Sequence, residues 1–331
     1  MSDPILEVRD LSVRYSSRNG DFTAVDHVSF HIDKGEILAL IGESGCGKTS
    51  LGKALVGLQS GLEGEILLHQ RNIARLPPRK LRGLRRAIQM VFQDPLSALD
   101  PRQRARKAVE MPLSLHSGLS RHDRSEKMAK LFDDVGLERE LQDRYPHQLS
   151  GGQRQRLNIA RALAPEPELI VCDEPVSALD VSLQKQIVDL LRQLQFRTGV
   201  SILFISHDLS VVERIASRIA VMYAGQIVEI LPKAQMWSHA AHPYTRLLLS
   251  TLPGVSPDRR RLRDAPVEED TPLNPYAIAK GCRFQLRCPN VKAECLQEAP
   301  VLAAQGSEHQ VACHFPHVPE ETAPIIKRAV S

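Results

Sequence analysis

Residues 42–49 read Gly-Glu-Ser-Gly-Cys-Gly-Lys-Thr and match the pattern G-x-x-x-x-G-K-[S/T] at every fixed position. The stretch follows the apolar run Ile37–Ile41 and precedes a predicted helix over 50–58, the strand–loop–helix context that this pattern requires. Glycines let successive backbone N–H groups turn toward phosphate oxygens, and the helix adds the positive end of its dipole. A chance glycine-rich turn would not need the flanking strand and helix. The sequence therefore predicts a phosphate-binding loop.

Two side chains of this loop have distinct predicted roles. Lys48 would neutralise the β- and γ-phosphates of a nucleotide, and the Thr49 hydroxyl would bind Mg²⁺. Cys46 could act as a redox switch, or its small side chain could simply fit the loop. The nucleotide contacts predicted here are Gly42, Glu43, Ser44, Gly45, Cys46, Gly47, Lys48, Thr49 and Ser50.

A second apolar run, Leu169–Cys172, ends in two acids, Asp173 and Glu174. Asp173 can hold Mg²⁺ through water, and Glu174 could polarise the water that attacks the γ-phosphate. Two acids after a strand could equally be a surface pair in a loop. Together with a phosphate-binding loop they indicate a nucleotide-hydrolysing site.

The apolar runs also predict the fold class. Residues 37–41, 169–172, 202–205 and 219–222 are too short for helices and suit strands that are covered on both faces, as in a parallel sheet. An apolar stripe from Leu183 to Leu194 predicts a helix between two of them, so we expect an α/β fold. Val28, Phe30 and Ile32 alternate with polar residues and predict an antiparallel strand. Between about 94 and 166 such runs stop, and helices over 120–135 and 151–164 predict a helical insertion.

Composition limits the class of protein. The 331 residues are 42% apolar and 25% charged, so the chain is typical of globular proteins and long enough for about two domains. A net charge of +4 does not by itself indicate a nucleic-acid-binding protein. The longest apolar stretch, 219–224, is too short to cross a bilayer. Because the first residues do not resemble a signal peptide, we expect a cytosolic chain.

Residues 149–153, Leu-Ser-Gly-Gly-Gln, open the helix predicted over 151–164 and offer a hydroxyl, free N–H groups and a helix dipole to an anion. The loop at 42–49 is already predicted to bind one nucleotide. A second phosphate-binding helix start would therefore serve a second nucleotide. With these motifs the sequence resembles the ATP-binding-cassette (ABC) ATPases, which are P-loop NTPases, over residues 1–235. The resemblance implies a head-to-tail dimer in which ATP lies between one loop and the partner's 149–153 segment.

The resemblance also assigns single residues. Gln93 would bind Mg²⁺ and water, His207 would sense the γ-phosphate, and Tyr15 would stack on adenine, although a histidine or tyrosine at a strand end is often structural. The loop 177–180 would couple the two nucleotide sites. The predicted catalytic residues are Lys48, Gln93, Glu174 and His207. The predicted Mg²⁺ ligands are Thr49, Gln93 and Asp173, and the further nucleotide contacts are Ser150, Gly151, Gly152, Gln153 and Asp180.

The remaining residues, 236–331, resemble the C-terminal extension of oligopeptide/dipeptide importer ATPases, a group that also serves nickel. The resemblance rests on His242-Pro-Tyr-Thr245 and on the run 281–289. Prolines between 253 and 275 and the basic run 259–263 predict a stiff, exposed linker.

Four cysteines crowd this extension with the spacing C-x5-C-x6-C-x17-C: Cys282, Cys288, Cys295 and Cys313. Four thiolates can bind Zn²⁺ or a [4Fe–4S] cluster, or the thiols could be unlinked. Zinc sites usually have tighter C-x2-4-C pairs, and Pro289 follows Cys288 as in cluster motifs. We therefore expect an iron–sulfur cluster ahead of zinc.

These observations predict the ATP-hydrolysing subunit of an ABC importer for di- or oligopeptides. The resemblance implies a second ATPase subunit, two membrane permease subunits and an extracytoplasmic solute-binding protein, with this chain peripheral on the cytoplasmic face of the membrane. Nickel, opines or other small solutes remain open as cargo. A nucleic-acid ABC ATPase is disfavoured because the insertion is short and only one cassette is present. A non-catalytic cassette is disfavoured because Lys48, Asp173, Glu174 and His207 are all present. The basic stretch from Arg71 to Arg86 could contact nucleic acid or a partner, or be merely solvated.

Overall fold

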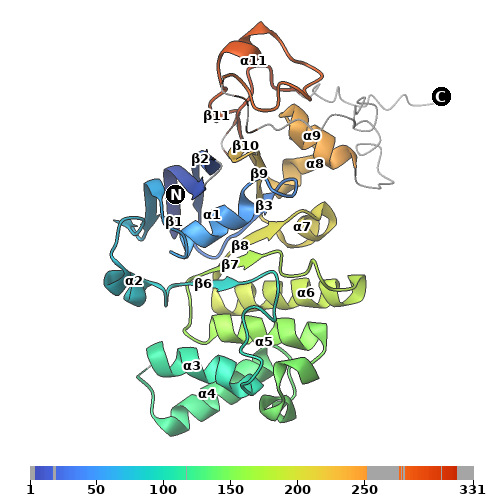
Figure 1. Cartoon of the computed structure of the whole chain (residues 1–331). Helices are drawn as coiled ribbons and strands as arrows, with labels where there is room; N and C mark the ends of the chain where they lie inside the picture. The colour runs from blue at the N-terminus through green and yellow to red at the C-terminus, as the bar shows by residue number, and fades with distance from the viewer. Residues whose placement is uncertain are drawn as a thin grey trace, which may run out of the picture. The chain divides into compact units, whose positions relative to one another are not determined.

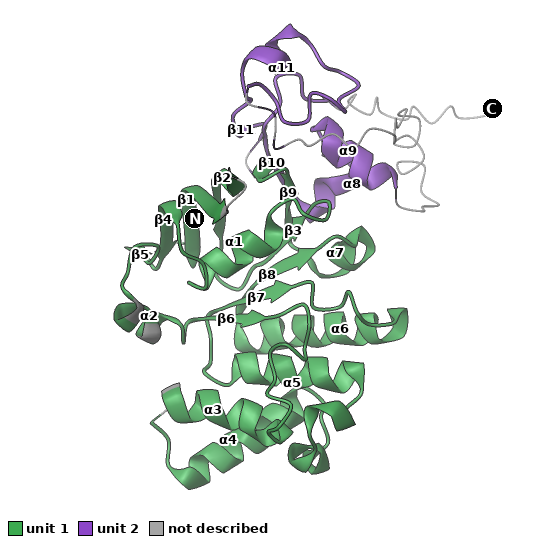
Figure 2. Ribbon diagram, viewed as in Figure 1, with its two compact units in different colours: residues 1–227 green, residues 228–331 purple. Residues whose placement is uncertain are grey.

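The structure is a computed structural model that describes residues 4–17, 20–116, 118–251, 276, 278, 280–306 and 308–318. The linker predicted over 253–275 lies outside the described residues. The chain divides into two compact units, residues 1–227 and 228–331, so the division falls before the predicted boundary at 235 (Figure 2).

The first unit contains two sheets (Figure 1). An antiparallel sheet has the order β2-β1-β4-β5, formed by Gly20–Ile32, Leu6–Ser17, Leu62–Leu68 and Arg71–Asn72. A parallel sheet has the order β9-β3-β8-β7-β6, formed by Arg218–Tyr223, Ile37–Ile41, Ser201–Ser206, Leu169–Asp173 and Ile88–Val91. Every residue of β3, β7 and β8 is buried, as expected for strands that are covered on both faces.

Helices connect these strands and form the insertion. α1 (Lys48–Leu55) follows β3, α6 (Val181–Thr198) joins β7 to β8, and α7 (Leu209–Ile215) joins β8 to β9. α2 (Pro78–Leu84) precedes β6. Between β6 and β7 lie α3 (Ala105–His116), α4 (Arg121–Asp134), the 3₁₀ turns Arg139–Asp143 and Pro146–Gln148, and α5 (Gly151–Leu163). The predicted α/β class, with an antiparallel sheet and a helical insertion, is therefore confirmed.

Local signals set the ends of these helices. Asp180 caps α6 by accepting a hydrogen bond from Leu183 N, and Gly199 ends it in the left-handed region with φ 71°. In α5, Ser150 and Gln153 each bond the other's backbone N–H, which satisfies two amides that the helix leaves free.

The second unit consists of short elements. β10 (Gln226–Pro232) pairs with β12 (Gln310–Val311), and β12 pairs with β11 (Ala303–Ala304). The helical elements are the 3₁₀ turn Lys233–Gln235, α8 (Met236–His239), α9 (Pro243–Ser250) and α11 (Ala293–Gln297). Its core includes Tyr244 and Phe284, whose ring centroids lie 5.5 Å apart. This unit therefore combines a few large buried side chains with the short paired strands β10, β12 and β11.

Candidate functional site

The loop between β3 and α1 has a shape that only glycine permits at two positions. A Cβ at Gly42 would lie 2.1 Å from Met222 O, and a Cβ at Gly47 would lie 2.2 Å from Ala24 O. Gly47 also has φ 107°. A Cβ at Gly45 would meet no described atom within 4 Å, so this position of the loop is open.

Lys48 holds the loop together from inside. Its ammonium donates to Gly42 O at 2.7 Å and to Glu43 O at 2.9 Å, and the residue is 5% exposed. A buried cation bonded to carbonyls attracts an anion. The neighbouring Cys46 is buried, and burial raises the pKa of its thiol, which keeps the thiol protonated and favours the packing interpretation over a redox switch.

Thr49 and Asp173 meet at the sheet edge where β3 and β7 end. Thr49 Oγ1 donates to Asp173 Oδ1 at 3.0 Å, and Asp173 is 2% exposed. Burial raises the pKa of Asp173, and the bond from Thr49 lowers it. A hydroxyl and a carboxylate are oxygen donors of the kind that Mg²⁺ prefers.

Glu174 is the point where three separate segments converge. Gln93 Nε2 donates to its Oε2 at 3.0 Å, and His207 Nδ1 lies 3.0 Å from its Oε1. Glu174 N donates to Ile205 O, and the residue has φ 44°, an uncommon conformation for a residue other than glycine. The three predicted residues, far apart in the sequence, therefore meet beside Asp173.

Tyr15 lies near the start of α1. Its hydroxyl lies 3.0 Å from Ser50 Oγ and 3.2 Å from Gln59 Oε1, and the residue is half-buried. Gln59 is a contact that the sequence did not indicate, because it lies outside the motif.

Ser150 and Asp180 both stand at helix starts on the exposed surface. Gly152 packs against Leu183 of α6, where a Cβ would lie 3.1 Å from its Cδ2. The bonds between Ser150 and Gln153 stay within the start of α5, and the carbonyls that Lys48 binds belong to its own loop. Within one chain each predicted phosphate site is thus held together by its own residues.

The four cysteines of the second unit line one small cavity of about 10 Å³, together with His242 and Phe284. Burial raises the pKa values of Cys282, Cys288 and Cys313, the last to about 11, and neighbouring thiols raise them further. In the part of the chain that the structure describes, no group of three or more His, Cys, Asp or Glu side chains has the arrangement of a metal site. The predicted iron–sulfur cluster therefore has no support from the side-chain geometry.

A buried polar cluster beside this cavity escaped the sequence analysis. Glu229 is 0% exposed and accepts hydrogen bonds from Ala241 N and His242 N, and His309 Nε2 lies 2.7 Å from its Oε1. Burial lowers the pKa of His242 to about 4. The signal was present as a single acid within the apolar run 227–231.

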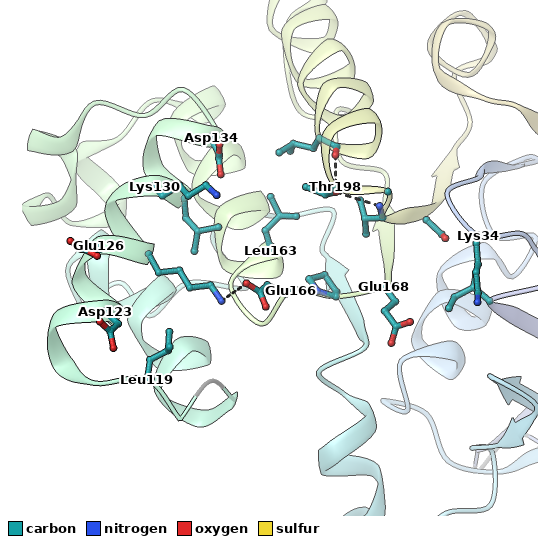
Figure 3. A pocket seen from close by; sticks show the side chains of 18 residues that line it. Lys34, Leu119, Asp123, Glu126, Lys130, Asp134, Leu163, Glu166, Glu168 and Thr198 are labelled. Atoms are coloured by element: carbon teal, nitrogen blue, oxygen red, sulfur yellow. Dashed lines mark hydrogen bonds and ion pairs between the residues drawn. The ribbon is translucent and has the colours of Figure 1, made fainter.

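A larger cavity of about 820 Å³ lies between α4 and the starts of β7 and β8 (Figure 3). Across it, Lys127 Nζ of α4 lies 2.6 Å from Glu166 of the α5–β7 turn. The nucleotide loops follow the opposite ends of these strands, so this cavity is remote from them. The ion pair links α4 to the turn that leads into β7.

Two large apolar side chains of α3 are exposed. Met111 is 53% and Leu115 is 70% exposed, and Leu96 nearby is 45% exposed. Met111 also lines a cavity of about 180 Å³ together with Leu99, Arg104 and Leu157.

No helix among the described residues is long and apolar enough to cross a bilayer.

Comparisons with known proteins agree with this geometry. A family model described as "ABC transporter" matches residues 25–177, and one described as "Oligopeptide/dipeptide transporter, C-terminal region" matches residues 228–295. The chain is 43% identical to the oligopeptide transport ATP-binding protein AppF of Bacillus subtilis, over 95% of this chain and 98% of that protein. It is 42% identical to the dipeptide transport ATP-binding protein DppF of Escherichia coli, over 95% of each.

Solved structures show the same fold for the cassette. The dimeric post-hydrolysis structure of the ATP-binding cassette MJ0796 bound to ADP and Pi has a TM-score of 0.63 and is 29% identical, covering 69% of this chain and 98% of that one. The structure of cbiO1 from Clostridium perfringens, part of the cbiONQ transporter complex, has a TM-score of 0.62 and is 28% identical, covering 71% and 90%.

Proposed function

The chain belongs to the ATP-binding proteins of the ABC transporter family, and we propose that it hydrolyses ATP to energise the import of di- or oligopeptides. The observation that carries the proposal is the meeting of Gln93, Glu174 and His207 beside the buried pair of Thr49 and Asp173. Relatives that match nearly the whole chain are named for peptide transport, and the family matched by the C-terminal residues is described as that of oligopeptide/dipeptide transporters. These similarities favour peptides over nickel, opines or another solute.

The proposed chemistry uses the residues around Glu174 and the 42–49 loop. Lys48 would exchange its bonds to loop carbonyls for the β- and γ-phosphates of ATP. Thr49, Asp173 and Gln93 would hold Mg²⁺, which neutralises charge on the phosphates. Glu174 would accept a proton from the attacking water, with Gln93 and His207 holding its two oxygens in place.

The 150–153 segment would complete the site of a second cassette. Ser150 is exposed, and the first amides of α5 would meet an anion at the helix start. Asp180, at the start of α6, would contact the same interface. The second cassette is either another copy of this chain or a related one. Support comes from the dimeric form of the similar cassette MJ0796.

The exposed apolar residues Leu96, Met111 and Leu115 are the proposed contact with the membrane permease. Met111 and Leu115 are one helical turn apart on α3, and exposed apolar side chains that gather together mark interaction sites. The chain would then sit at the cytoplasmic face of the membrane as a peripheral subunit, with two permease subunits and an extracytoplasmic solute-binding protein completing the importer.

The cysteine cavity is the proposed site of a metal cofactor. Four thiols fit such a group by donor chemistry, and support comes from their shared cavity. Thiolates can hold either an iron–sulfur cluster or Zn²⁺, and we propose the cluster ahead of zinc. Iron, sulfide and zinc analysis of the purified chain, compared with Cys288→Ser protein, tests this. Equal metal content in both proteins would contradict the site.

The Glu174→Gln substitution tests the catalytic assignment. We expect ATP hydrolysis to fall by about 10³-fold because the amide cannot accept the proton, while ATP binding persists. Phosphate release and nucleotide binding are measured on the complex recovered from membranes in detergent. Glu140→Gln, an exposed acid on a 3₁₀ turn, is the matched control. Unchanged ATP hydrolysis in the Glu174→Gln protein would contradict the catalytic assignment. If the chain is recovered from membranes in detergent without a permease, the transport role is contradicted.

A further inference from the structure

The stretch from Arg71 to Arg86 is the most strongly charged part of the chain, and the proposed ATPase mechanism does not use it. It contains seven cations, here called the basic surface: Arg71, Arg75, Arg79, Lys80, Arg82, Arg85 and Arg86. No acid occurs anywhere in residues 66–93. Because the whole chain carries only +4, the other residues contain three more acids than bases. The positive charge is therefore concentrated on one segment.

Most of these cations have no acid to neutralise them. No ion pair joins Arg71, Arg75, Arg79 or Lys80 to an acid in the described part of the chain, and all four are exposed. Arg86 differs, because its guanidinium lies 3.6 Å from Glu166. Some exposed cations elsewhere on the first unit do pair with acids, as in Arg104–Asp143 and Arg139–Asp133. The basic surface differs in density, because four exposed cations without an ion pair among the described residues fall within residues 71–80, which contain no acid.

The packing of α2 leaves the charged side chains of Arg79 and Lys80 exposed. Leu81 lies against Gly57 at the end of α1, where its Cδ1 is 3.6 Å from the position of a Cβ, and Arg85 donates to Gly57 O at 3.1 Å. Leu81 and Leu84 are half-buried, whereas Arg79 and Lys80 are exposed. Figure 1 shows α2 at the edge of the first unit. The helix therefore packs through Leu81 and presents Arg79 and Lys80 to the surroundings.

We propose that the basic surface contacts the anionic phospholipid headgroups of the membrane beside the permease. The inference rests on the proposed role as a peripheral transporter subunit, which brings the chain to a membrane. Cations distributed along a helix and its flanking loops suit a surface of spread negative charge. None of the described cavities is lined by Arg71, Arg75, Arg79 or Lys80, so these cations do not converge on a compact ligand. An acidic loop of a protein or a nucleic acid would be a different partner.

Sedimentation of the full chain with lipid vesicles tests the proposal without the permease. The vesicles contain phosphatidylcholine with phosphatidylglycerol, or phosphatidylcholine alone. Each cation near an anionic membrane strengthens binding about fivefold. We expect the fourfold variant Arg71→Gln, Arg75→Gln, Arg79→Gln and Lys80→Gln to bind anionic vesicles at least about tenfold more weakly. Binding of the unaltered chain should weaken as salt rises and be weak to phosphatidylcholine alone.

A matched variant separates position from net charge. Arg121→Gln, Lys185→Gln, Arg192→Gln and Arg214→Gln together remove the same charge from exposed positions elsewhere in the first unit. This variant should retain vesicle binding, and thermal unfolding verifies that both variants fold. Equal loss in both variants, or no preference for anionic vesicles, overturns the proposal. The proposal is also overturned if the fourfold variant at 71, 75, 79 and 80 keeps vesicle binding but no longer recovers the permease in detergent. Binding of DNA rather than anionic vesicles by the unaltered chain overturns it as well. None of these outcomes alters the Glu174 test.

Discussion

The loop over 42–49 takes its shape from backbone geometry within eight consecutive residues, whereas the cysteine cavity of the second unit is formed by four side chains spread over residues 282–313. Gly42 and Gly47 lie against backbone carbonyls, and the loop joins a fully buried strand to a helix. The four cysteines come from irregular segments and one short helix, spread over residues 282–313. Contiguous residues thus make the first site, and long-range packing makes the second.

The difference lies in what each region needs in order to stay folded. The nucleotide loop is supported by the parallel sheet on one side and α1 on the other. The second unit has short strands and keeps buried ionisable groups, Glu229 and His242, inside. We therefore expect substitutions that add a side chain at the loop glycines to destabilise the first region. We expect the second region to lose stability as the pH falls.

The largest expected effect is that of Gly47→Ala. The new Cβ would lie 2.2 Å from Ala24 O, and the alanine would have to adopt the φ of 107° that glycine has here. We therefore expect a loss of about 3 kcal/mol in the free energy of unfolding. Gly45→Ala is the matched control, because it has φ 80° but open space, and should cost about 1 kcal/mol. Urea unfolding measures both. Equal costs would mean that close backbone approach does not shape the loop.

The second prediction concerns acid. The pKa of His242 is lowered to about 4 by burial, against an ordinary value of 6.5. Between these values the unfolded chain binds a proton that the folded chain does not, so stability falls as the pH falls from about 6.5 to 4. We expect this residue to contribute about 3 kcal/mol of that loss.

His242→Asn provides the comparison, because asparagine can still cap α9, where His242 Nδ1 now accepts a hydrogen bond from Tyr244 N. Unfolding free energies measured between about pH 7 and pH 4 should fall less steeply for His242→Asn than for the unaltered chain. Parallel curves would show that the acid sensitivity originates elsewhere.

The smallest expected effect is at the ion pair between Lys127 and Glu166. The side chains are 22% and 63% exposed, so solvent screens the pair and Lys127→Ala should cost about 0.5 kcal/mol. A double-mutant cycle with Glu166→Gln isolates the interaction. A coupling well above about 1 kcal/mol would mean that this contact fixes the helical insertion more firmly than exposure allows.

Much of the first unit could be predicted because its signals are local. The runs at 37–41, 169–172, 202–205 and 219–222 are the cores of β3, β7, β8 and β9, and the helix predicted over 50–58 corresponds to α1 over 48–55. Glu174 and His207 each follow a predicted strand, and parallel strands end at one edge of a sheet. The roles of Gln93 and His207 were implied by the resemblance to the ABC ATPases, and the structure places both beside Glu174.

The sequence by itself determined the α/β class, the phosphate-binding loop and the two acids at 173 and 174, because each depends on short patterns in which neighbouring residues carry the signal. Only the tertiary structure decided that Glu229 is buried with His242 and His309, that the four thiols share one cavity, and that α2 presents unpaired cations outward. Burial, pairing and exposure depend on contacts between residues that are distant in the sequence, and these contacts exist only once the chain has packed.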